Sequence, residues 1–242
     1  MCGWSLPSGV FAVSTVRESI HMKLLDLFCG AGGAAMGYRI AGFNEIVGVD
    51  HIPQPRYPFT FIQGDALEYL AAHGEEYDVI HASPPCQAYV VGLRAVNTVL
   101  GRQTAYGDYL AETYARLHSL GIPWIIENVE TAPLRQAVRL CGSSFGLPLR
   151  RHRLFASSIM LLVPQCDHAW QTVKQYRTNW RQGQQQRQST VVQAYGNSGD
   201  IQEWKMALGI DWMMTHAELS QAIPPAYTRC IGQQALQHLR KA

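Results

Sequence analysis

The chain has 242 residues, of which 47% are hydrophobic and 16% are charged, and its formal net charge is +2. This length suffices for one domain with a hydrophobic core. The composition is that of a globular protein rather than a disordered or fibrous one, and no apolar run reaches the about 18 residues that suggest a membrane span. The 6 cysteines are scattered without repeated pairs, which argues against a disulfide framework and for a reducing compartment.

Residues 1–21 differ in character from the rest of the chain. They contain Gly, Ser and Pro, and no Lys or Arg precedes their short apolar stretch, so the positive start of a secretion signal is missing. Met22 stands directly before the first strand-like run. We therefore expect 1–21 to be a loose extension upstream of a natural start, with a short surface helix as the alternative.

Apolar runs alternate with helical segments between residue 23 and residue 156. The expected strands are 23–28, 45–50, 59–63, 77–82, 123–126 and 154–156, and the expected helices are 34–41, 66–72 and 107–120. Such alternation predicts βαβ units and a mostly parallel sheet. Glycines and acids come after several of these strands, and open α/β sheets bind ligands at the carboxyl ends of their strands.

The pattern dissolves between about 157 and 199, where the chain is polar and basic and carries a glutamine-rich run at 182–188. We expect a small insert or loop region there. Helical signals return from Ile201, and Pro224 and Pro225 stand at the start of a last helix of about 225–240.

Positive charge is concentrated in one part of the chain. Residues 135–199 hold 9 Lys or Arg against 1 acid, whereas 1–134 hold 7 against 13 and 200–242 hold 4 of each. A local excess of positive charge is typical of a surface that binds a polyanion. A solvated face is the alternative.

The first candidate site is the glycine-rich segment Asp26-Leu-Phe-Cys-Gly-Ala-Gly-Gly33. Glycines let a backbone approach a ligand closely, but the Gly-Lys-Ser/Thr of a phosphate loop is missing, which disfavours ATP. Asp50 ends the second strand and suits a ribose diol, and Asp65 after the third could accept from an adenine amino group. Each acid could instead cap a helix or turn, but together the strand ends favour an adenosine cofactor.

The second candidate site combines Cys86 with Glu127. Cys86 lies in the proline-stiffened loop Ser83-Pro-Pro-Cys-Gln87 after the fourth strand, and a nucleophilic thiol needs exposure and a lowered pKa. Glu127 and Asn128 end the next strand, where an acid could exchange a proton with a bound base. A structural cysteine and a helix-capping acid are the alternatives.

Four motifs in this order, Asp26–Gly33, Pro84-Pro-Cys-Gln87, Glu127-Asn-Val129 and Arg151-His-Arg-Leu-Phe155, resemble those of the cytosine-C5 DNA methyltransferases. The resemblance covers about 22–158 and resumes at about 204–240. It implies an α/β, Rossmann-like methyltransferase fold that uses S-adenosylmethionine (SAM), with a small basic target-recognition insert. The implied parts are the extension 1–21, a SAM-binding catalytic domain 22–156, a target-recognition region 157–199, and helices in 200–242 that complete the catalytic domain.

The resemblance also implies roles for single residues. Cys86 would be the nucleophile, Glu127 would bind the N3 edge of cytosine and Arg153 its O2, while Arg151, Asn128 and Pro85 would support the site. The residues implied for SAM are Asp26, Phe28, Cys29, Gly30, Ala31, Gly32, Gly33, Asp50, His51, Asp65, Ala66, Ser83, Pro84 and Gln221. The residues expected to contact the substrate are Gln87, Lys174, Arg177, Trp180, Arg181, Arg187 and Tyr195.

Several positions depart from the family pattern. Gly48 stands where an acid is usual, Leu149 replaces a Gln, Val90 a Ser, and Gln221 an Asn that contacts SAM. Fewer than 50 residues separate Phe155 from Trp204, so the target-recognition region is short. Such a small element can grip phosphates and insert a few side chains, which predicts a recognition site of about two to four base pairs.

We expect a monomer that acts on double-stranded DNA without a membrane partner, in the cytoplasm of a prokaryotic cell or phage-infected host. A separately encoded endonuclease partner, a phage enzyme and an orphan enzyme all stay open. Alternative functions are methylation of RNA, SAM binding without turnover, transfer of another group from a modified SAM, and a mononucleotide substrate. No metal is expected, because Cys166 and His168 lack a second pair and Cys141 and His152 are irregularly spaced.

Overall fold

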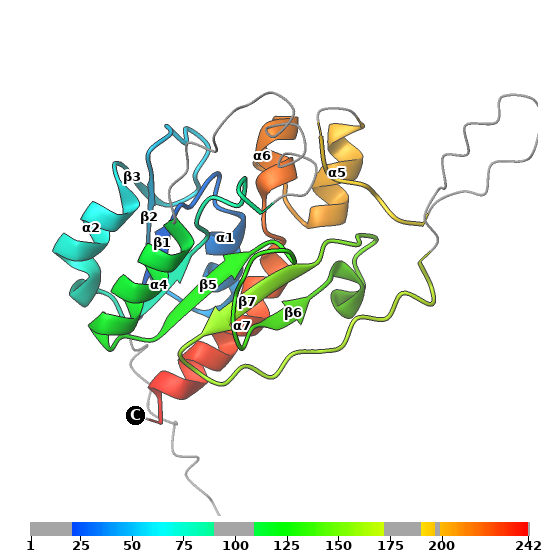
Figure 1. The fold of residues 1–242 in the computed structure, drawn as a ribbon. Coiled ribbons are helices and arrows are strands. Elements are labelled where there is room, and N and C mark those ends of the chain that lie inside the picture. Colours follow the sequence, from blue (N-terminus) through cyan, green and yellow to red (C-terminus); the bar gives the residue numbers. More distant parts are fainter. Residues whose placement is uncertain (1–20, 90–108, 172–189, 197–198, 242) are drawn as a thin grey trace, which may run out of the picture.

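The computed structural model describes residues 21–89, 109–171, 190–196 and 199–241. Within these ranges a seven-stranded sheet has the order β3-β2-β1-β4-β5-β7-β6 (Figure 1). The five parallel strands are β1 (Lys23–Leu27), β2 (Glu45–Asp50), β3 (Thr60–Gln63), β4 (Val79–Ala82) and β5 (Trp124–Asn128). The antiparallel strands are β7 (Arg153–Ser157), which pairs with β5, and β6 (Val138–Leu140), which pairs with β7. The predicted α/β class with a mostly parallel sheet is confirmed.

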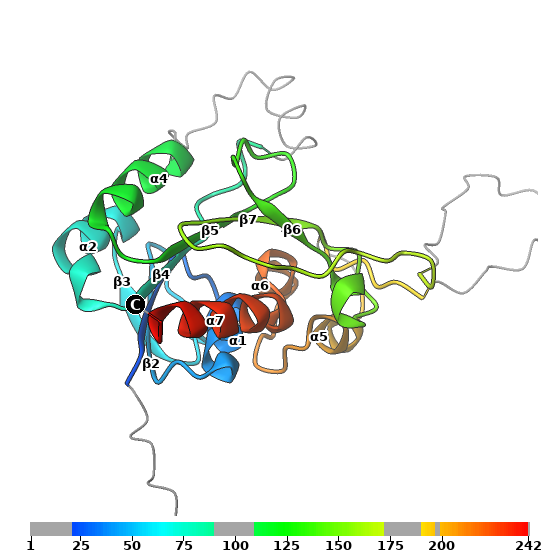
Figure 2. The same ribbon diagram turned by 90° about the horizontal axis from the view of Figure 1, so that it is seen from below.

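Helices cover both faces of the sheet, so the molecule has three layers (Figure 2). One face carries α2 (Ala66–His73) and α4 (Tyr109–Leu120), and the other carries α1 (Gly33–Ala41) and α7 (Pro225–Leu239). The remaining helices are α5 (Ile201–Leu208) and α6 (His216–Gln221), and the short 3-10 helices are η1 (Gly74–Glu76) and η2 (Gly142–Phe145).

Alternating side chains of the strands build the two halves of the core. Leu24 and Ile46 pack with α1 and α7, whereas their neighbours Leu25 and Val47 pack with α2 and α4. A third apolar cluster around Trp204 joins α5 and α6. The strands are therefore buried on both faces, which explains their nearly continuous apolar runs.

The C-terminal helix α7 packs along α1 at very short range. A β-carbon on Gly232 would lie 2.8 Å from Cβ of Ala41 and 2.9 Å from the ring of Tyr38. The hydroxyl of Thr228 donates to the carbonyl of Ala34 at 2.8 Å. Residues near the C-terminus thus help to form the body that carries the glycine-rich loop.

The stretch after β7 contains no helix or strand in its described parts, 158–171, 190–196 and 199. It is still packed on the body, since Ile159 and Leu161 are buried and Val192 bridges to Leu149. Strand β6 was not predicted. Residues 1–20, which include nearly all of the expected N-terminal extension, lie outside the described residues, as does Val90. None of the helices in the described ranges has the length and apolar character to cross a bilayer.

Candidate active site

A cavity of about 600 Å³ opens at the carboxyl ends of β1, β2, β4 and β5. Its lining brings together the two candidate sites of the sequence. The implied SAM residues in the lining are Asp26, Phe28, Cys29, Gly30, Ala31, Gly33, Asp50, His51, Ser83, Pro84 and Gln221, and the implied catalytic and substrate residues are Pro85, Cys86, Gln87, Glu127 and Arg153. This volume lies in the usual range of small-molecule sites.

The glycine-rich loop is held open by its backbone and by Asp50. Phe28 and Gly30 have φ angles of 55° and 48°, a left-handed conformation that is uncommon for Phe. The amide of Gly30 donates to Oδ2 of Asp50 at 3.0 Å, and the amide of Ile52 donates to Oδ1 at 3.0 Å. A β-carbon on Gly30 would meet nothing within 4 Å, so this part of the loop faces open space.

Asp26 has an unpaired oxygen at the cavity. The Tyr57 hydroxyl donates to Oδ2 of Asp26 at 3.1 Å, while the buried Oδ1 has no hydrogen-bond partner in the described ranges. Burial raises the pKa of Asp26 well above its usual value, and Asp50 raises it too, against the bond from Tyr57, which lowers it. The ring of Tyr57 also fills the space where a side chain at Gly48 would lie. The absence of an acid at position 48 is therefore explained by the position of Tyr57.

Asp65, Ala66 and Gly32 do not line this cavity. Asp65 caps α2, accepting from the amides of Leu67 at 2.8 Å and Glu68 at 2.9 Å. The helix-cap alternative is thus what the structure shows for Asp65, and the geometry gives no support to its expected contact with adenine.

Cys86, Glu127 and Arg153 form one wall of the cavity. Nε of Arg153 lies 3.1 Å from Oε1 of Glu127, and both side chains are largely buried. Burial raises the pKa of Glu127, and Arg153, a hydrogen bond from Ser83 and Arg151 lower it in part. Burial and then Glu127 raise the pKa of the Cys86 thiol, against Arg153. Burial therefore outweighs the positive charge near this thiol, and the lowered pKa that a nucleophilic thiol needs stays a prediction.

A buried chain of hydrogen bonds leads to Glu127 from the far side of β4. The Tyr38 hydroxyl lies 3.0 Å from Nδ1 of His81, and Nε2 of His81 lies 3.1 Å from Oγ of Ser83, which bonds Glu127. Burial lowers the pKa of His81 to about 3, so the ring is neutral at pH 7. If Ser83 donates to Glu127, then Nε2–H donates to Ser83 and Tyr38 donates to Nδ1. Every donor in this arrangement points toward the carboxylate.

Arg151 and Asn128 lie behind the wall and position it. Arg151 donates to the carbonyls of Ser220 at 2.6 Å and Ala194 at 3.3 Å, and burial lowers its pKa to about 9. Nδ2 of Asn128 donates to the carbonyl of Pro84 at 3.0 Å. These contacts tie the Cys86 loop to β5 and the start of β7 to the C-terminal segment.

The residues expected to contact the substrate fall into three groups. Gln87 lines the cavity, and within the described part of the chain its buried Oε1 has no hydrogen-bond partner. Tyr195 is 64% exposed. Lys174, Arg177, Trp180, Arg181 and Arg187 lie outside the described residues.

Several residues in or beside the cavity were not predicted from the sequence. Nε of Arg56 pairs with Oε1 of Glu218 at 2.7 Å, across 162 residues of sequence, and both line the cavity. Ile52 also lines it although the side chain is 54% exposed. Trp212 donates to the carbonyl of Ala31 at 2.8 Å. Only the capping box at Thr215 and Glu218 has a local signal, the Thr-x-x-Glu spacing.

The chain resembles known methyltransferases in parts of its sequence and in its fold. No family model matches the chain. The chain is 32% identical over 83 residues to the Type II methyltransferase M.AgeI of Thalassovita gelatinovora, which covers 28% of this chain and 19% of that protein. It is 30% identical over 139 residues to the Type II methyltransferase M.HgiDI of Herpetosiphon aurantiacus, and this match covers 52% of this chain and 42% of that protein.

Among solved structures, the S. pombe Dnmt2 methyltransferase has a TM-score of 0.58 at 12% identity, over 90% of this chain and 99% of that one. This likeness shows the fold. The predicted resemblance to methyltransferases and the Rossmann-like methyltransferase fold are therefore confirmed. The chain spans less than half the length of the two curated relatives.

Proposed function

We propose that this protein transfers a methyl group from SAM to C5 of a cytosine in DNA, with Cys86 as the nucleophile. The observation that carries the proposal is the shared cavity, which has the glycine-rich loop and Asp50 on one side and Cys86, Glu127 and Arg153 on the other. A cofactor on the loop and a base against Cys86 would then meet within one enclosure. The similarity to Type II methyltransferases supports this reading.

The residues of the loop fit SAM. The buried, unpaired Oδ1 of Asp26 suits a donor such as the cofactor's ammonium group, and Asp50 at the end of β2 suits the ribose hydroxyls. Ile52 offers an apolar surface for the adenine ring. When bound, SAM supplies an electrophilic methyl group on a sulfonium.

The chemistry assigns one task to each residue of the wall. The Cys86 thiol rests protonated because burial raises its pKa, and a thiolate that forms there gains from the nearby positive charge of Arg153. Addition of the sulfur to C6 of cytosine breaks the C5–C6 double bond and makes C5 nucleophilic. Glu127, whose pKa burial raises, holds a proton at N3 and stabilises the ring as the electrons move. After C5 has taken the methyl group, water accepts the C5 proton, the C5–C6 double bond re-forms, and the C6–S bond breaks to release the Cys86 thiolate.

A cytosine inside a duplex cannot reach this wall, so the base must be flipped out of the stack. Gln87 has an unpaired buried oxygen in the cavity and could accept from the extruded base. Arg153 would contact O2 of the base while its Nε remains near Glu127.

The test is methyl transfer from labelled SAM to duplex DNA and, in parallel, to tRNA, with mass analysis of the nucleosides. We expect 5-methylcytosine from DNA with the wild type, none with Cys86→Ala, and full activity with Cys230→Ser, a cysteine on α7 that does not line the cavity. DNA containing 5-fluorocytosine should trap a covalent complex with the wild type only, because fluorine cannot leave as the proton does. Activity on tRNA alone would replace DNA by RNA as the substrate. SAM binding without turnover on either would refute the enzymatic proposal.

A further inference from the structure

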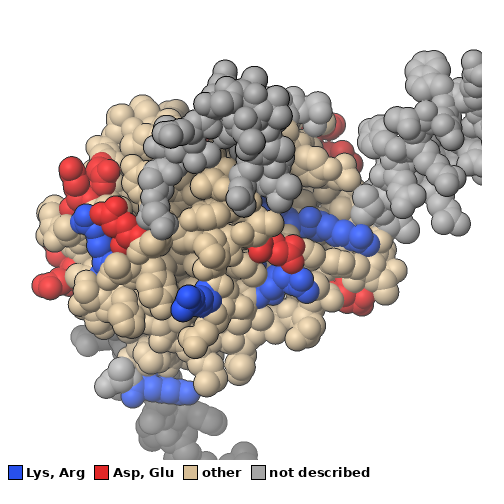
Figure 3. All heavy atoms as spheres, in the orientation of Figure 1, with Lys and Arg blue, Asp and Glu red and all other residues tan. Residues whose placement is uncertain are grey.

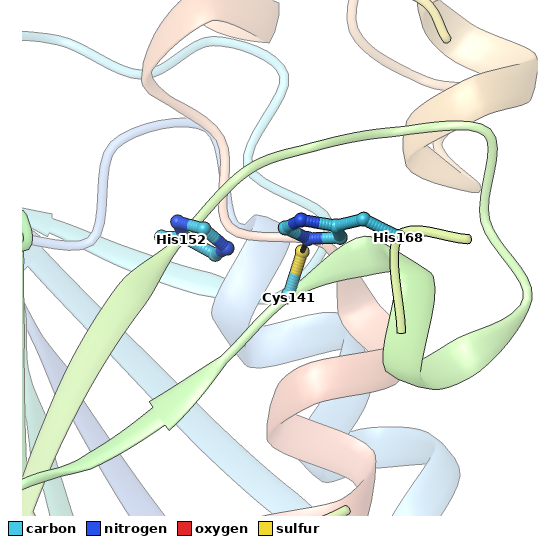
Figure 4. Close-up of side chains that lie close together, drawn as sticks. All are labelled: Cys141, His152 and His168. Carbon is cyan, nitrogen blue, oxygen red and sulfur yellow. Dashed lines mark hydrogen bonds between the residues drawn. The ribbon is translucent and has the colours of Figure 1, made fainter. Parts of the chain in front are cut away.

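Cys141, His152 and His168 meet at the edge of the sheet, outside the cavity (Figure 4). Cys141 directly follows β6, His152 directly precedes β7, and His168 comes from the segment that continues after β7. Sγ of Cys141 lies 3.3 Å from Nε2 of His168, and the three potential ligand atoms all lie within 4.8 Å of one another. Cys141 is fully buried, and both histidines are half-buried.

The hydrogen bonds around His152 leave one ring nitrogen free for a further partner. Nδ1 of His152 lies 3.1 Å from Oε2 of Glu130, whose other oxygen accepts from Nη1 of Arg139 at 2.9 Å. Nε2 of His152 is buried and has no hydrogen-bond partner among the residues that the structure describes. A carboxylate on the far nitrogen of a metal-binding histidine is the usual arrangement, because it fixes the tautomer and turns the other nitrogen toward the metal.

The Cys141–His168 distance suits two ligands of one tetrahedral metal ion, and His152 lies within 4.8 Å of both. With zinc–sulfur and zinc–nitrogen bonds of about 2.3 and 2.05 Å, sulfur and nitrogen ligands lie about 3.6 Å apart. The Cys141–His168 separation of 3.3 Å is within a few tenths of an ångström of that value. A simple hydrogen bond from the Cys141 thiol to His168 would account for this contact, but it leaves Nε2 of His152 without a partner.

We propose that Cys141, His152 and His168 bind a zinc-class divalent metal ion. Binding releases the thiol proton of Cys141, and the two imidazoles bind as neutral ligands. This site replaces the sequence-based expectation of no metal. The irregular spacing of the three residues hid it, because the β6–β7 pairing and the return of the chain to His168 bring them together.

The metal would join three chain segments beside the candidate active site. His152 is adjacent in sequence to Arg153, and Nη1 of Arg153 donates to the carbonyl of His152 at 2.8 Å. His168 comes shortly before the basic residues that begin at Lys174. The ion would therefore hold the start of β7 together with the described segment around His168, whatever reaction the cavity performs.

The test is metal binding by the full chain after chelation and dialysis, using zinc for stoichiometry and cobalt(II) for spectroscopy. We expect one metal per chain and a thiolate-to-cobalt charge-transfer band. Cys141→Ser should abolish the band, and His168→Ala or His152→Ala should weaken binding by tenfold or more. Cys230→Ser and Cys166→Ser should leave both readouts unchanged, the second because Cys166 lies against Arg139 rather than in the cluster.

Circular dichroism of each variant without metal separates lost binding from lost folding. A wild type that takes up no stoichiometric zinc would overturn the proposal. A cobalt band that survives Cys141→Ser, or disappears in Cys166→Ser, would show that the ligands are different. Metal content is measured without DNA or SAM, so its outcome is distinct from that of the methyl-transfer assay.

Discussion

The buried His81 should make the fold sensitive to acid. Its folded-state pKa is about 3 because burial disfavours the charged ring, whereas an unfolded histidine titrates near pH 6.5. The folded-state pKa is thus depressed, so the stability linked to His81 is complete above about pH 6.5 and is lost as the pH falls toward 3. Below pH 6.5 the unfolded chain binds a proton that the folded chain excludes.

The size of the effect is set by the pKa difference. Each pH unit below 6.5 should remove about 1.4 kcal/mol of unfolding free energy through this side chain, or about 2 kcal/mol at pH 5. His81→Gln keeps polar atoms that can face Ser83 and Tyr38 but cannot take up a proton. Its unfolding free energy should therefore fall less than that of the wild type between pH 7.5 and pH 5.

Urea unfolding at these two pH values measures the difference. His118→Gln, at an exposed position on α4, is the matched control and should keep the wild-type pH dependence. If His81→Gln and the wild type lose the same stability between pH 7.5 and 5, then His81 is charged in the folded protein. The donor arrangement from Tyr38 to Glu127 would then be wrong.

Three further substitutions address the cavity. Ser83→Ala removes a hydrogen bond to Glu127 and leaves His81 short of a partner, so we expect the unfolding free energy to fall by about 1–3 kcal/mol. The pH–rate profile should shift to higher pH, because the bond from Ser83 lowers the pKa of Glu127. An unshifted profile would show that Ser83 does not influence Glu127. Tyr57→Phe deprives Asp26 of its only hydrogen-bond donor among the described residues. The KM for SAM should rise about tenfold, equivalent to about 1.4 kcal/mol of binding free energy, with kcat little changed. A change in kcat alone would contradict this. Arg56→Met breaks the pair with Glu218, so the KM for SAM should rise. Calorimetry should show a loss of unfolding free energy of no more than about 1 kcal/mol, because the arginine is partly exposed. A larger loss would mean that the pair mainly stabilises the fold.

Local sequence patterns predicted most of the sheet and the cavity's central residues. Apolar runs marked β1, β2 and β4, and the residues directly after them face the same edge because parallel strands carry their carboxyl ends together. Strand β6 was missed because it has only three residues and depends on pairing with β7. Asp65 caps α2, and its expected contact with adenine stays a prediction, because a polar residue after a strand suits a helix cap as well as a ligand contact.

The remaining features depend on contacts between distant parts of the chain. Tyr57 reaches Asp26, Arg56 reaches Glu218, and Trp212 reaches Ala31, and none of these pairs has a fixed spacing in sequence. The same is true of the proposed metal ligands, which come from two strand ends and a returning segment. Such pairs become visible only when the strand order and the position of the C-terminal helices are known.

The basic segment shows why a charge count overstates a binding surface. The structure describes five of the nine cations in 135–199, and they are Arg135, Arg139, Arg150, Arg151 and Arg153. Arg151 is buried, Arg153 pairs with Glu127, and Arg139 pairs with Glu130. On the face that Figure 3 draws, acidic side chains accordingly lie close to Lys and Arg side chains.

Arg150 also has protein partners, since it donates to the backbone and side chain of Gln171. At least three of the five described cations, Arg139, Arg151 and Arg153, therefore contact the candidate active site or residues beside the proposed metal ligands. Cations that are already paired release fewer counterions from a nucleic acid than free ones would, so they add little to affinity. The expected grip on DNA phosphates then rests on the cations without an acidic partner. Among the described residues these are the exposed Arg135 and Arg150, and the others, Lys174, Arg177, Arg181 and Arg187, lie outside the described residues. A charge excess in sequence thus indicates a polyanion surface only after the cations held by internal acids have been set aside.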